Sequence, residues 1–229
     1  MKSFIIHLSK IENSLASATK LQNDLKTFGI NAELFEGSYG NEVKKRYYET
    51  GRRYHPWSFK NGPDNPFDDD YRDSQQLPGE MGCFDSHYRL WEKCVELDET
   101  IMIFEDDALI VRPYHPVEFE EVLITVFGNP TKSAKYYHYF TDPTGDPKAE
   151  WWSQASMPGT PGYAIKPSAA KKLVDMYKNT WLPSDNAIML KIVMIQVHSY
   201  VIGRALIGED GKRSLVRGKG GFWENFKND

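Results

Sequence analysis

The chain has 229 residues, of which 40% are hydrophobic and 14% aromatic, and its formal net charge is −4. This length and apolar content are sufficient for a domain with its own core, and they exclude a disordered chain. The small negative charge argues against a protein whose surface is covered with phosphate contacts. We therefore expect one domain spanning residues 1–229.

The sequence has no run of eighteen apolar residues, and its first eight residues lack the basic and long apolar regions of a signal peptide. We expect a soluble, cytoplasmic protein. Cys83 and Cys94 are eleven positions apart on what looks like one helix. Because this spacing is about 16 Å along a helix axis, they cannot form a disulfide, and both are expected to be buried thiols.

The first 35 residues predict a strand, a helix and a second strand. Residues 4–8 form an apolar strand, and Ser9 can cap a helix that Gly29 ends. Residues 31–35 supply the next strand. This order is typical of a βαβ unit with a right-handed crossover, so we expect an α/β fold with a mostly parallel central sheet flanked by helices.

The composition changes between residues 42 and 76. Helix signals continue to about Thr50, after which Gly and Pro residues favour a loop-rich insertion. Its aromatic residues argue against disorder, so we interpret it as a functional loop or lid. The three aspartates at 68–70 are interpreted as a solvated turn, because no strand leads into them.

Residues 77–97 predict an amphipathic helix, and the apolar run 101–104 predicts a buried strand beside it. The strand ends at Glu105, Asp106 and Asp107, where open α/β sheets present ligands. Adjacent acids repel one another unless a cation neutralises them, and hard divalent ions prefer carboxylate oxygen. The pattern predicts a metal site for a phosphate-bearing ligand, and a solvated acidic turn is the alternative.

Beyond this acidic triplet the sequence predicts shorter elements. Residues 141–158 are polar, and their two tryptophans are candidates for substrate contact by stacking. Asp185 lies in the first turn of a short helix, where an acid also favours the helix dipole. The expected elements are a helix at 116–127, a strand at 134–140, a strand at 163–165, a helix at 167–177, a helix from 183 and a strand at 192–202.

In the tail, the segment 208–221 holds Lys212, Arg213, Arg217 and Lys219 among five glycines. Such a segment can close over a diphosphate, or it can be a solvated tail. The sequence contains no zinc-type Cys/His spacing, Walker loop, GxGxxG turn or GxSxG elbow. Hydrolase chemistry based on serine or cysteine therefore has no support.

Four sequence blocks in the same order resemble glycosyltransferase family 25, the lipooligosaccharide and procollagen galactosyltransferase family. They are the helix at 77–97, the strand that ends in the acidic triplet, the segment 159–173 and the segment 182–185. The resemblance covers the chain except for about 42–76 and the tail. The residues that match the family's main motif are Gly79, Glu80, Gly82, Cys83, Ser86, His87, Leu90, Trp91, Glu105, Asp106 and Asp107.

This resemblance implies a single GT-A type, Rossmann-like domain that moves a sugar from a nucleotide-sugar donor, expected to be a UDP-sugar, to an acceptor hydroxyl. It implies Mn²⁺ or Mg²⁺, with Asp107 as ligand, Asp106 assisting and Glu105 facing the ribose. The other residues expected to bind the donor are His7, Leu8 and Ser9 in the loop after the first strand, His87 and Arg213.

The acceptor hydroxyl needs a base within hydrogen-bond reach. We expect Asp185 to be this base, because it matches the family's Pro-x-Asp block, and the resemblance implies inversion at the sugar carbon. Glu80 and His87 are the reserve candidates for the base.

The acceptor implied by the resemblance is a lipooligosaccharide-type glycan, with residues 42–76 as an acceptor-side loop. Cations and rings alternate between residues 44 and 57, which also suits nucleic acid. A glycosyltransferase acting on a flipped hydroxymethylated base of phage DNA, in a host cytosol, is therefore an alternative. A catalytically inactive sugar-binding protein is a third, against which the intact motifs argue. The residues expected to contact the acceptor are Arg52, Arg53, Tyr54, Trp57, Trp151 and Trp152.

Overall fold

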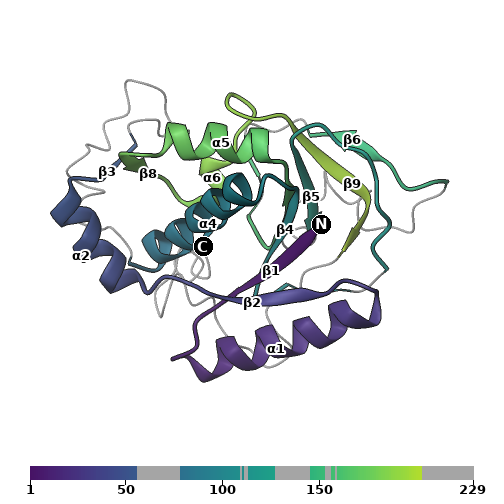
Figure 1. Ribbon diagram of the computed structural model, residues 1–229, viewed down its shortest axis with the longest axis horizontal. Helices are drawn as coiled ribbons and strands as arrows, with labels where there is room; N and C mark the ends of the chain where they lie inside the picture. Colours follow the sequence, from purple (N-terminus) through teal and green to yellow (C-terminus); the bar gives the residue numbers. More distant parts are fainter. Residues whose placement is uncertain are drawn as a thin grey trace, which may run out of the picture.

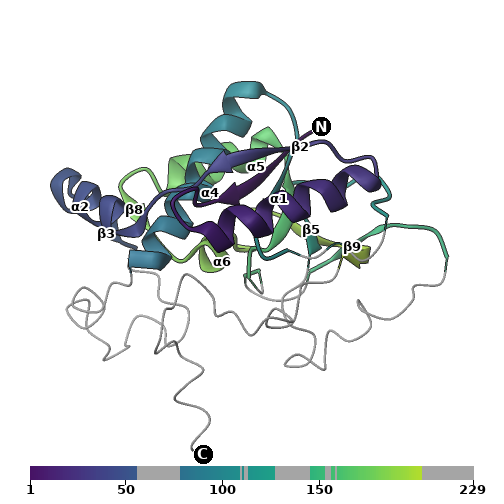
Figure 2. The same ribbon diagram turned by 90° about the horizontal axis from the view of Figure 1, so that it is seen from below.

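The computed structural model describes residues 1–55, 78–108, 110, 113–126, 145–152, 156–157 and 159–202. Its centre is a seven-stranded sheet with the strand order β2-β1-β4-β7-β5-β9-β6. In Figure 1, α4 and α5 cover one face of this sheet and α1 lies on the other. Figure 2 shows α1 running alongside β1 and β2. The predicted α/β fold with helices flanking a central sheet is confirmed.

The predicted βαβ unit is present as β1 (Lys2–His7), α1 (Glu12–Thr27) and β2 (Ala32–Glu36), with β1 and β2 parallel. The expectation that Ser9 caps the helix is wrong: the helix begins at Glu12, its N-cap is Ile11, and no side chain caps it. The Ser9 backbone N–H donates to Glu36 Oε1 at 3.1 Å, which ties the loop after β1 to the end of β2. Gly29 ends the helix as expected, with a φ of 81° that suits a residue without a Cβ.

The helix and acidic strand at the centre of the sequence are also confirmed. They are α4 (Pro78–Leu97) and β4 (Ile101–Glu105), and the first four residues of β4 are fully buried. Side chains of β4 alternate between the two faces of the sheet: Ile101 and Ile103 pack beneath α4 and α5, and Met102 and Phe104 pack towards α1. Burial on both faces explains why the sequence shows a continuous apolar run.

The predicted helix at 116–127 is wrong, because the structure has the strand β5 (Val122–Val126) there. All five residues of this strand are buried between β7 and β9. Its β-branched residues fit a pleated surface packed on both sides better than a helix. The predicted strand at 134–140 lies outside the described residues.

The chain from residue 162 onwards follows the prediction more closely. The strand β6 (Ala149–Trp151) was not foreseen, and it pairs antiparallel with residues 196–198, in the first half of the last described strand. The other elements are β7 (Gly162–Ile165), α5 (Pro167–Met176), α6 (Ser184–Ala187) and β9 (Ile195–Ile202).

The segment after α2 pairs with a strand from the second half of the chain. The helix α2 (Gly40–Thr50) ends at Gly51, as the sequence predicts, and β3 (Arg53–Tyr54) follows. β3 pairs in parallel with β8 (Thr180–Trp181), which leads into α6. Of the predicted insertion at 42–76, residues 56–77 lie outside the described part of the chain.

The sheet combines parallel and antiparallel pairs. β1 pairs in parallel with β2 and β4, β5 pairs in parallel with β9, and β7 is antiparallel to both β4 and β5. Among the described strands, β2, β1, β4, β5 and β9 therefore run in one direction and β7 and β6 in the other, so the sheet is mostly parallel, as predicted.

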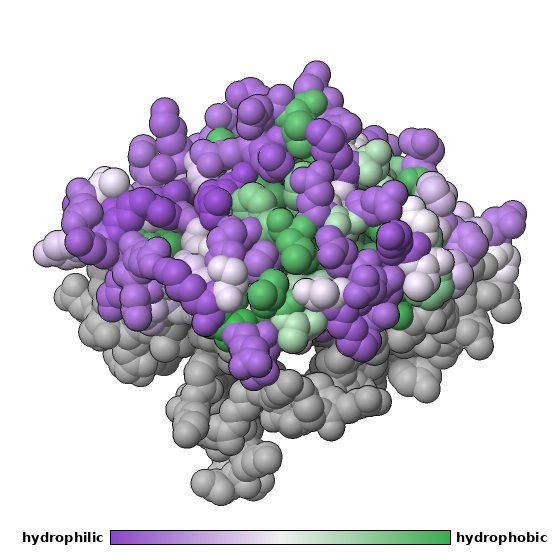
Figure 3. Space-filling view, turned by 60° about the horizontal axis from the view of Figure 1, so that its bottom comes forward, coloured by the Kyte–Doolittle hydropathy of each residue, from purple (hydrophilic) through white to green (hydrophobic). Residues whose placement is uncertain are grey.

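Figure 3 shows a face of the molecule that is mainly hydrophilic, with a smaller hydrophobic area at its centre. None of the helices in the described ranges is long and apolar enough to cross a bilayer.

Candidate functional site

The acidic triplet lies at the carboxyl end of β4. Glu105 is the last residue of the strand and pairs in register with Ile6 of β1, and Asp106 and Asp107 form the turn that follows. Asp107 is exposed, whereas Glu105 and Asp106 are half-buried. The carboxylates therefore occupy the edge of the parallel strands where ligands bind in open α/β sheets, as the sequence predicts.

Glu105 is the point where four elements meet. Its Oε1 accepts a hydrogen bond from Thr160 Oγ1 at 2.6 Å and lies 3.2 Å from His87 Nε2 and 3.8 Å from Cys83 Sγ. Thr160 Oγ1 is 2.8 Å from Ser184 Oγ, which in turn is 3.2 Å from Cys83 Sγ. These contacts join α4, β4, the segment before β7 and α6.

Asp185 enters the site through α6. It follows Ser184 directly, and its Oδ1 accepts from the Asn186 backbone N–H at 3.0 Å. Burial raises the pKa of the Cys83 thiol well above its usual value, and the charges of Glu105, Asp185 and Asp107 raise it further. Asp185 and two acids of the triplet, Glu105 and Asp107, are therefore all close enough to the Cys83 thiol to affect its pKa. Cys83 is half-buried rather than fully buried as expected, because it lies on the face of α4 that borders these acids.

Glu80 lies on the same face of α4, one turn before Cys83 and two turns before His87. It is half-buried, whereas His87 is fully buried. The i, i+3, i+7 spacing therefore places both reserve candidates for the base on the side of the helix that faces the triplet.

Asp106 is tied to the loop after β1 by a residue that the sequence interpretation missed. Ser14 Oγ donates to Asp106 Oδ2 and accepts from the Leu8 backbone N–H at 2.9 Å. Burial raises the pKa of Asp106 to about 6; the hydrogen bond from Ser14 opposes this rise, and the charges of Asp107 and Glu105 add to it. The signal for Ser14 was its position on the buried stripe of α1, which is Ser14, Ala18, Leu21 and Leu25.

The donor set at the end of β4 fits a hard divalent cation. Asp106 and Asp107 provide carboxylate oxygens, which are the ligands that Mn²⁺ and Mg²⁺ prefer. Burial, together with the charges of Asp107 and Glu105, raises the pKa of Asp106, and a cation bound beside these carboxylates would favour its ionised form.

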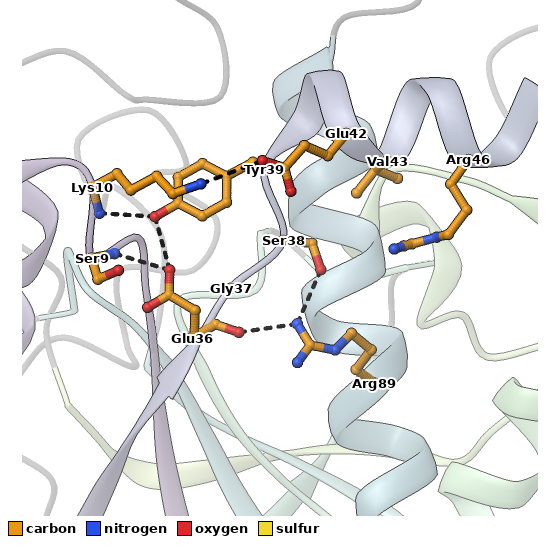
Figure 4. Close-up of a pocket in the computed structure, with 10 residues that line it drawn as sticks. All are labelled: Ser9, Lys10, Glu36, Gly37, Ser38, Tyr39, Glu42, Val43, Arg46 and Arg89. Atoms are coloured by element: carbon orange, nitrogen blue, oxygen red, sulfur yellow. Dashed lines mark hydrogen bonds and ion pairs between the residues drawn. The ribbon is translucent and has the colours of Figure 1, made fainter.

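The loop after β1 borders a cavity of about 420 Å³ at the carboxyl ends of β1 and β2. Figure 4 shows Arg89 of α4 reaching across it to the Glu36 carbonyl at 3.0 Å and to Ser38 Oγ at 3.1 Å. Ser9 lines the cavity, and His7 lies behind it, with its Nε2 3.9 Å from Glu36 Oε2. The lining residues are Ser9, Lys10, Glu36, Gly37, Ser38, Tyr39, Glu42, Val43, Arg46 and Arg89.

Arg52, an expected acceptor contact, is used inside the protein. Its Nε donates to the Thr180 carbonyl at 3.0 Å and its guanidinium to the Tyr177 carbonyl at 2.5 Å. The same group lies 4.1 Å from the ring centroid of Tyr88 and 4.8 Å from that of Tyr47. Arg52 thus holds β3 against the end of α5 and the start of β8.

The other expected acceptor contacts are distributed over two places. Arg53 is exposed on β3, and Tyr54 beside it packs edge-to-face on Trp181, with ring centroids 5.0 Å apart. Trp151 is 60% exposed on β6, whereas Trp152 is buried and its Nε1 donates to the Ser156 carbonyl. β3 lies beside the strand that leads to Asp185, and β6 lies at the far edge of the sheet. Trp57 and Arg213 lie outside the described residues.

Comparison with known proteins gives a consistent assignment. The family model described as glycosyltransferase family 25 (LPS biosynthesis protein) matches residues 1–188. A glycosyltransferase 25 family member of Drosophila pseudoobscura pseudoobscura is 31% identical over 104 residues, which is 44% of this chain and 15% of that protein. The lipooligosaccharide biosynthesis protein lex-1 of Haemophilus influenzae is 30% identical over 146 residues, which is 54% of this chain and 46% of that protein.

The chain spans less than half the length of each of these relatives. The family match nevertheless covers β1, the whole of α4 and β4, and the segment up to α6, which are the elements that build the site. The resemblance inferred from the sequence motifs is thereby confirmed. The chain belongs to glycosyltransferase family 25.

Proposed function

We propose that this protein transfers a sugar from a nucleoside diphosphate to an acceptor hydroxyl, with Asp185 as the base. The observation that carries this proposal is the line of contacts from Glu105 through Thr160 to Ser184, which holds the start of α6 against the end of β4. It brings a candidate base, Asp185, and the candidate metal ligands Asp106 and Asp107 together from positions 79 and 78 residues apart in sequence.

The donor side is built from the acids of β4 and the loop after β1. Asp107 and Asp106 would hold Mn²⁺ or Mg²⁺, which when bound supplies compensation for the charge that develops on the leaving diphosphate. Glu105 faces the ribose, and the cavity beside Ser9 takes the base of a UDP-sugar. Ser14 orients Asp106 through its hydroxyl.

On the acceptor side, Asp185 accepts the proton of the attacking hydroxyl. It is half-buried, so its carboxylate is within reach of a ligand while it remains partly shielded from water. The hydrogen bond from the Asn186 backbone N–H stabilises the ionised form that a base requires.

We propose a lipooligosaccharide-type glycan as the acceptor, as the name of the Haemophilus influenzae relative suggests. The alternative, phage DNA, rested on the cations between residues 44 and 53. Two of these are used inside the protein: Arg46 pairs with the buried Asp85, and Arg52 is held by backbone carbonyls. Cations used in this way contribute little to a nucleic-acid surface.

The test is transfer of label from a panel of UDP-sugars, with Mn²⁺, to a lipooligosaccharide core or to DNA containing hydroxymethylcytosine. Label on the glycan supports the proposal, and Asp185→Asn should reduce transfer at least about 100-fold while donor affinity stays within about twofold. Asp175→Asn, an exposed acid of α5 paired with Lys171, is the matched control.

Three results would contradict the proposal. Label on DNA that falls as salt increases would favour a modified base as acceptor. Donor binding without hydrolysis or transfer would indicate a sugar-binding protein. Normal turnover of Asp185→Asn with an inactive Glu80→Gln would exchange the roles of these two residues.

A further inference from the structure

A buried row of polar side chains leads from the core to Glu105. Trp91 Nε1 donates to the Tyr163 hydroxyl at 2.8 Å, this hydroxyl is 2.9 Å from His87 Nδ1, and His87 Nε2 is 3.2 Å from Glu105 Oε1. Trp91, Tyr163 and His87 have no exposed surface. The distances alone do not say which histidine nitrogen carries the proton.

The donor and acceptor in each of these hydrogen bonds follow from the chemistry of the side chains. An indole nitrogen can only donate, so the Tyr163 oxygen accepts from Trp91 and its hydrogen remains to be placed. Within the described part of the chain, His87 Nδ1 is the one acceptor in contact with the Tyr163 hydroxyl. If Nδ1 carried the proton, a buried hydroxyl hydrogen would have no acceptor, which is unfavourable. His87 Nδ1 therefore accepts, and Nε2–H donates to Glu105.

A second row of hydrogen bonds leads to Glu105 through Thr160 and Ser184, and its donors and acceptors can be assigned in the same way. Thr160 donates to the Glu105 carboxylate, so its oxygen accepts from Ser184, and Ser184 in turn can accept from the Cys83 thiol. Both rows end on the same oxygen, Glu105 Oε1, and the second passes through Ser184, the residue that precedes Asp185.

We infer that His87 and Thr160 are positioning residues, which receive their orientation from Trp91, Tyr163 and Ser184 and hold Glu105 at a fixed angle beside Asp185. This inference rests on the proposed transfer reaction, in which Glu105 and Asp185 contact the two substrates. It assigns His87 a role different from base or direct donor contact.

These hydrogen bonds also argue against a metal site formed by the same side chains. Cys83, His87 and Glu105 each offer a metal ligand, and these ligand atoms lie within 4.8 Å of one another. A soft cation would need the lone pair of His87 Nε2, but the row from Trp91 places a proton there. The geometry therefore favours hydrogen bonding over a second metal centre at this position.

The first test is the tautomer of His87, measured by long-range proton–nitrogen NMR on the full chain with isotopically labelled histidine. The chain has six histidines, and the His87→Gln variant identifies the signal. We expect the Nε2–H form in the wild type, unchanged by added Zn²⁺, and a mixture of forms in Tyr163→Phe. An Nδ1–H form, or loss of the Nε2 proton on adding Zn²⁺ alone, would overturn the inference.

The second test separates positioning from general stability. Thr160→Val should lower kcat by about tenfold to 100-fold with the donor KM within about twofold, and Thr160→Ser should restore it. Thr125→Val is the matched control, because Thr125 is a buried threonine of β5 whose hydroxyl has no partner among the described residues. A Thr160→Val kcat equal to that of the control would overturn the inference.

The two tests also distinguish this inference from the proposed function. If the wild type transfers no sugar, the proposed function fails and the tautomer of His87 decides the inference without turnover. If the wild type is active and the tautomer is Nδ1–H, the proposed function stands and the inference fails.

Discussion

Asp107 is the exposed member of the acidic triplet and the one expected to contact the metal most directly. We predict that Asp107→Ala lowers the metal-dependent affinity for UDP by at least about tenfold, because one of two carboxylate ligands is lost. Isothermal titration with and without Mn²⁺ measures this, with Asp175→Ala of α5 as the control. Affinity equal to that of the wild type in Mn²⁺ would remove Asp107 from the site.

Arg52 and Arg53 are neighbours with different environments, which makes them a matched pair. Arg52 donates to two backbone carbonyls, whereas Arg53 is exposed. Arg52→Ala should destabilise the protein by about 1–3 kcal/mol because it leaves those carbonyls unpaired, and Arg53→Ala should change stability by less than about 0.5 kcal/mol. Urea unfolding compares the two, and equal effects would show that the contacts of Arg52 contribute no stability.

At the scale of elements, Asp85 connects α4 to α2. It is buried, and its carboxylate accepts hydrogen bonds from Ser38 at 2.5 Å and Tyr47 at 2.8 Å and pairs with Arg46 at 2.5 Å. Burial alone would raise the pKa of Asp85, but the hydrogen bonds from Arg46, Ser38 and Tyr47 outweigh it and hold the pKa below its usual value of 3.8.

The lowered pKa of Asp85 predicts that the stability of the folded protein decreases at acidic pH. Because the folded state lowers the pKa of Asp85, its contribution to stability is complete above the usual value and is lost as pH falls through the lowered pKa. We predict that Asp85→Asn costs about 1–3 kcal/mol at pH 7 and that the difference from the wild type narrows near pH 3. A difference that stays constant between these two pH values in urea unfolding would contradict this account.

The same pair of helices explains a glycine of the sequence motif. A Cβ on Gly82 would lie 2.5 Å from the Ser38 carbonyl oxygen, a backbone atom that cannot move aside cheaply. Gly82 therefore allows α4 to approach the segment after β2, and Ser38 in that segment lines the cavity beside Ser9. Gly82→Ala should destabilise the protein by about 1–3 kcal/mol, measured by thermal unfolding against Glu96→Ala on the exposed end of α4.

Across the whole molecule, the burial of each element predicts which parts unfold locally most easily. Every residue of β5 and β7 is buried, as are four of the five residues of β4, whereas α2 buries only Val43 and Tyr47. We predict that amide hydrogen exchange is slowest in β4, β5 and β7 and faster in α2 and β3. Protection of α2 equal to that of β4 would contradict this order.

The sequence was sufficient to predict the elements whose signals are local. The βαβ unit, α4 with the buried strand β4 and the acids at its end follow from periodicity, apolar runs and glycine positions, which act through neighbours in the chain. Motif order was sufficient to identify the family. The same local signals misjudged β5, because a strand that is buried on both faces has no polar face to mark its period.

The assembly of the site depends on contacts between distant parts of the chain. The insertion of antiparallel β7 beside β4 brings Thr160 to Glu105, and the packing of α6 brings Ser184 and Asp185 to the same place. The tertiary structure also puts Ser14 against Asp106 and places Arg52 in internal contacts. These pairings join residues up to 128 positions apart, and no local pattern encodes them, because they depend on which strands become neighbours when the core packs.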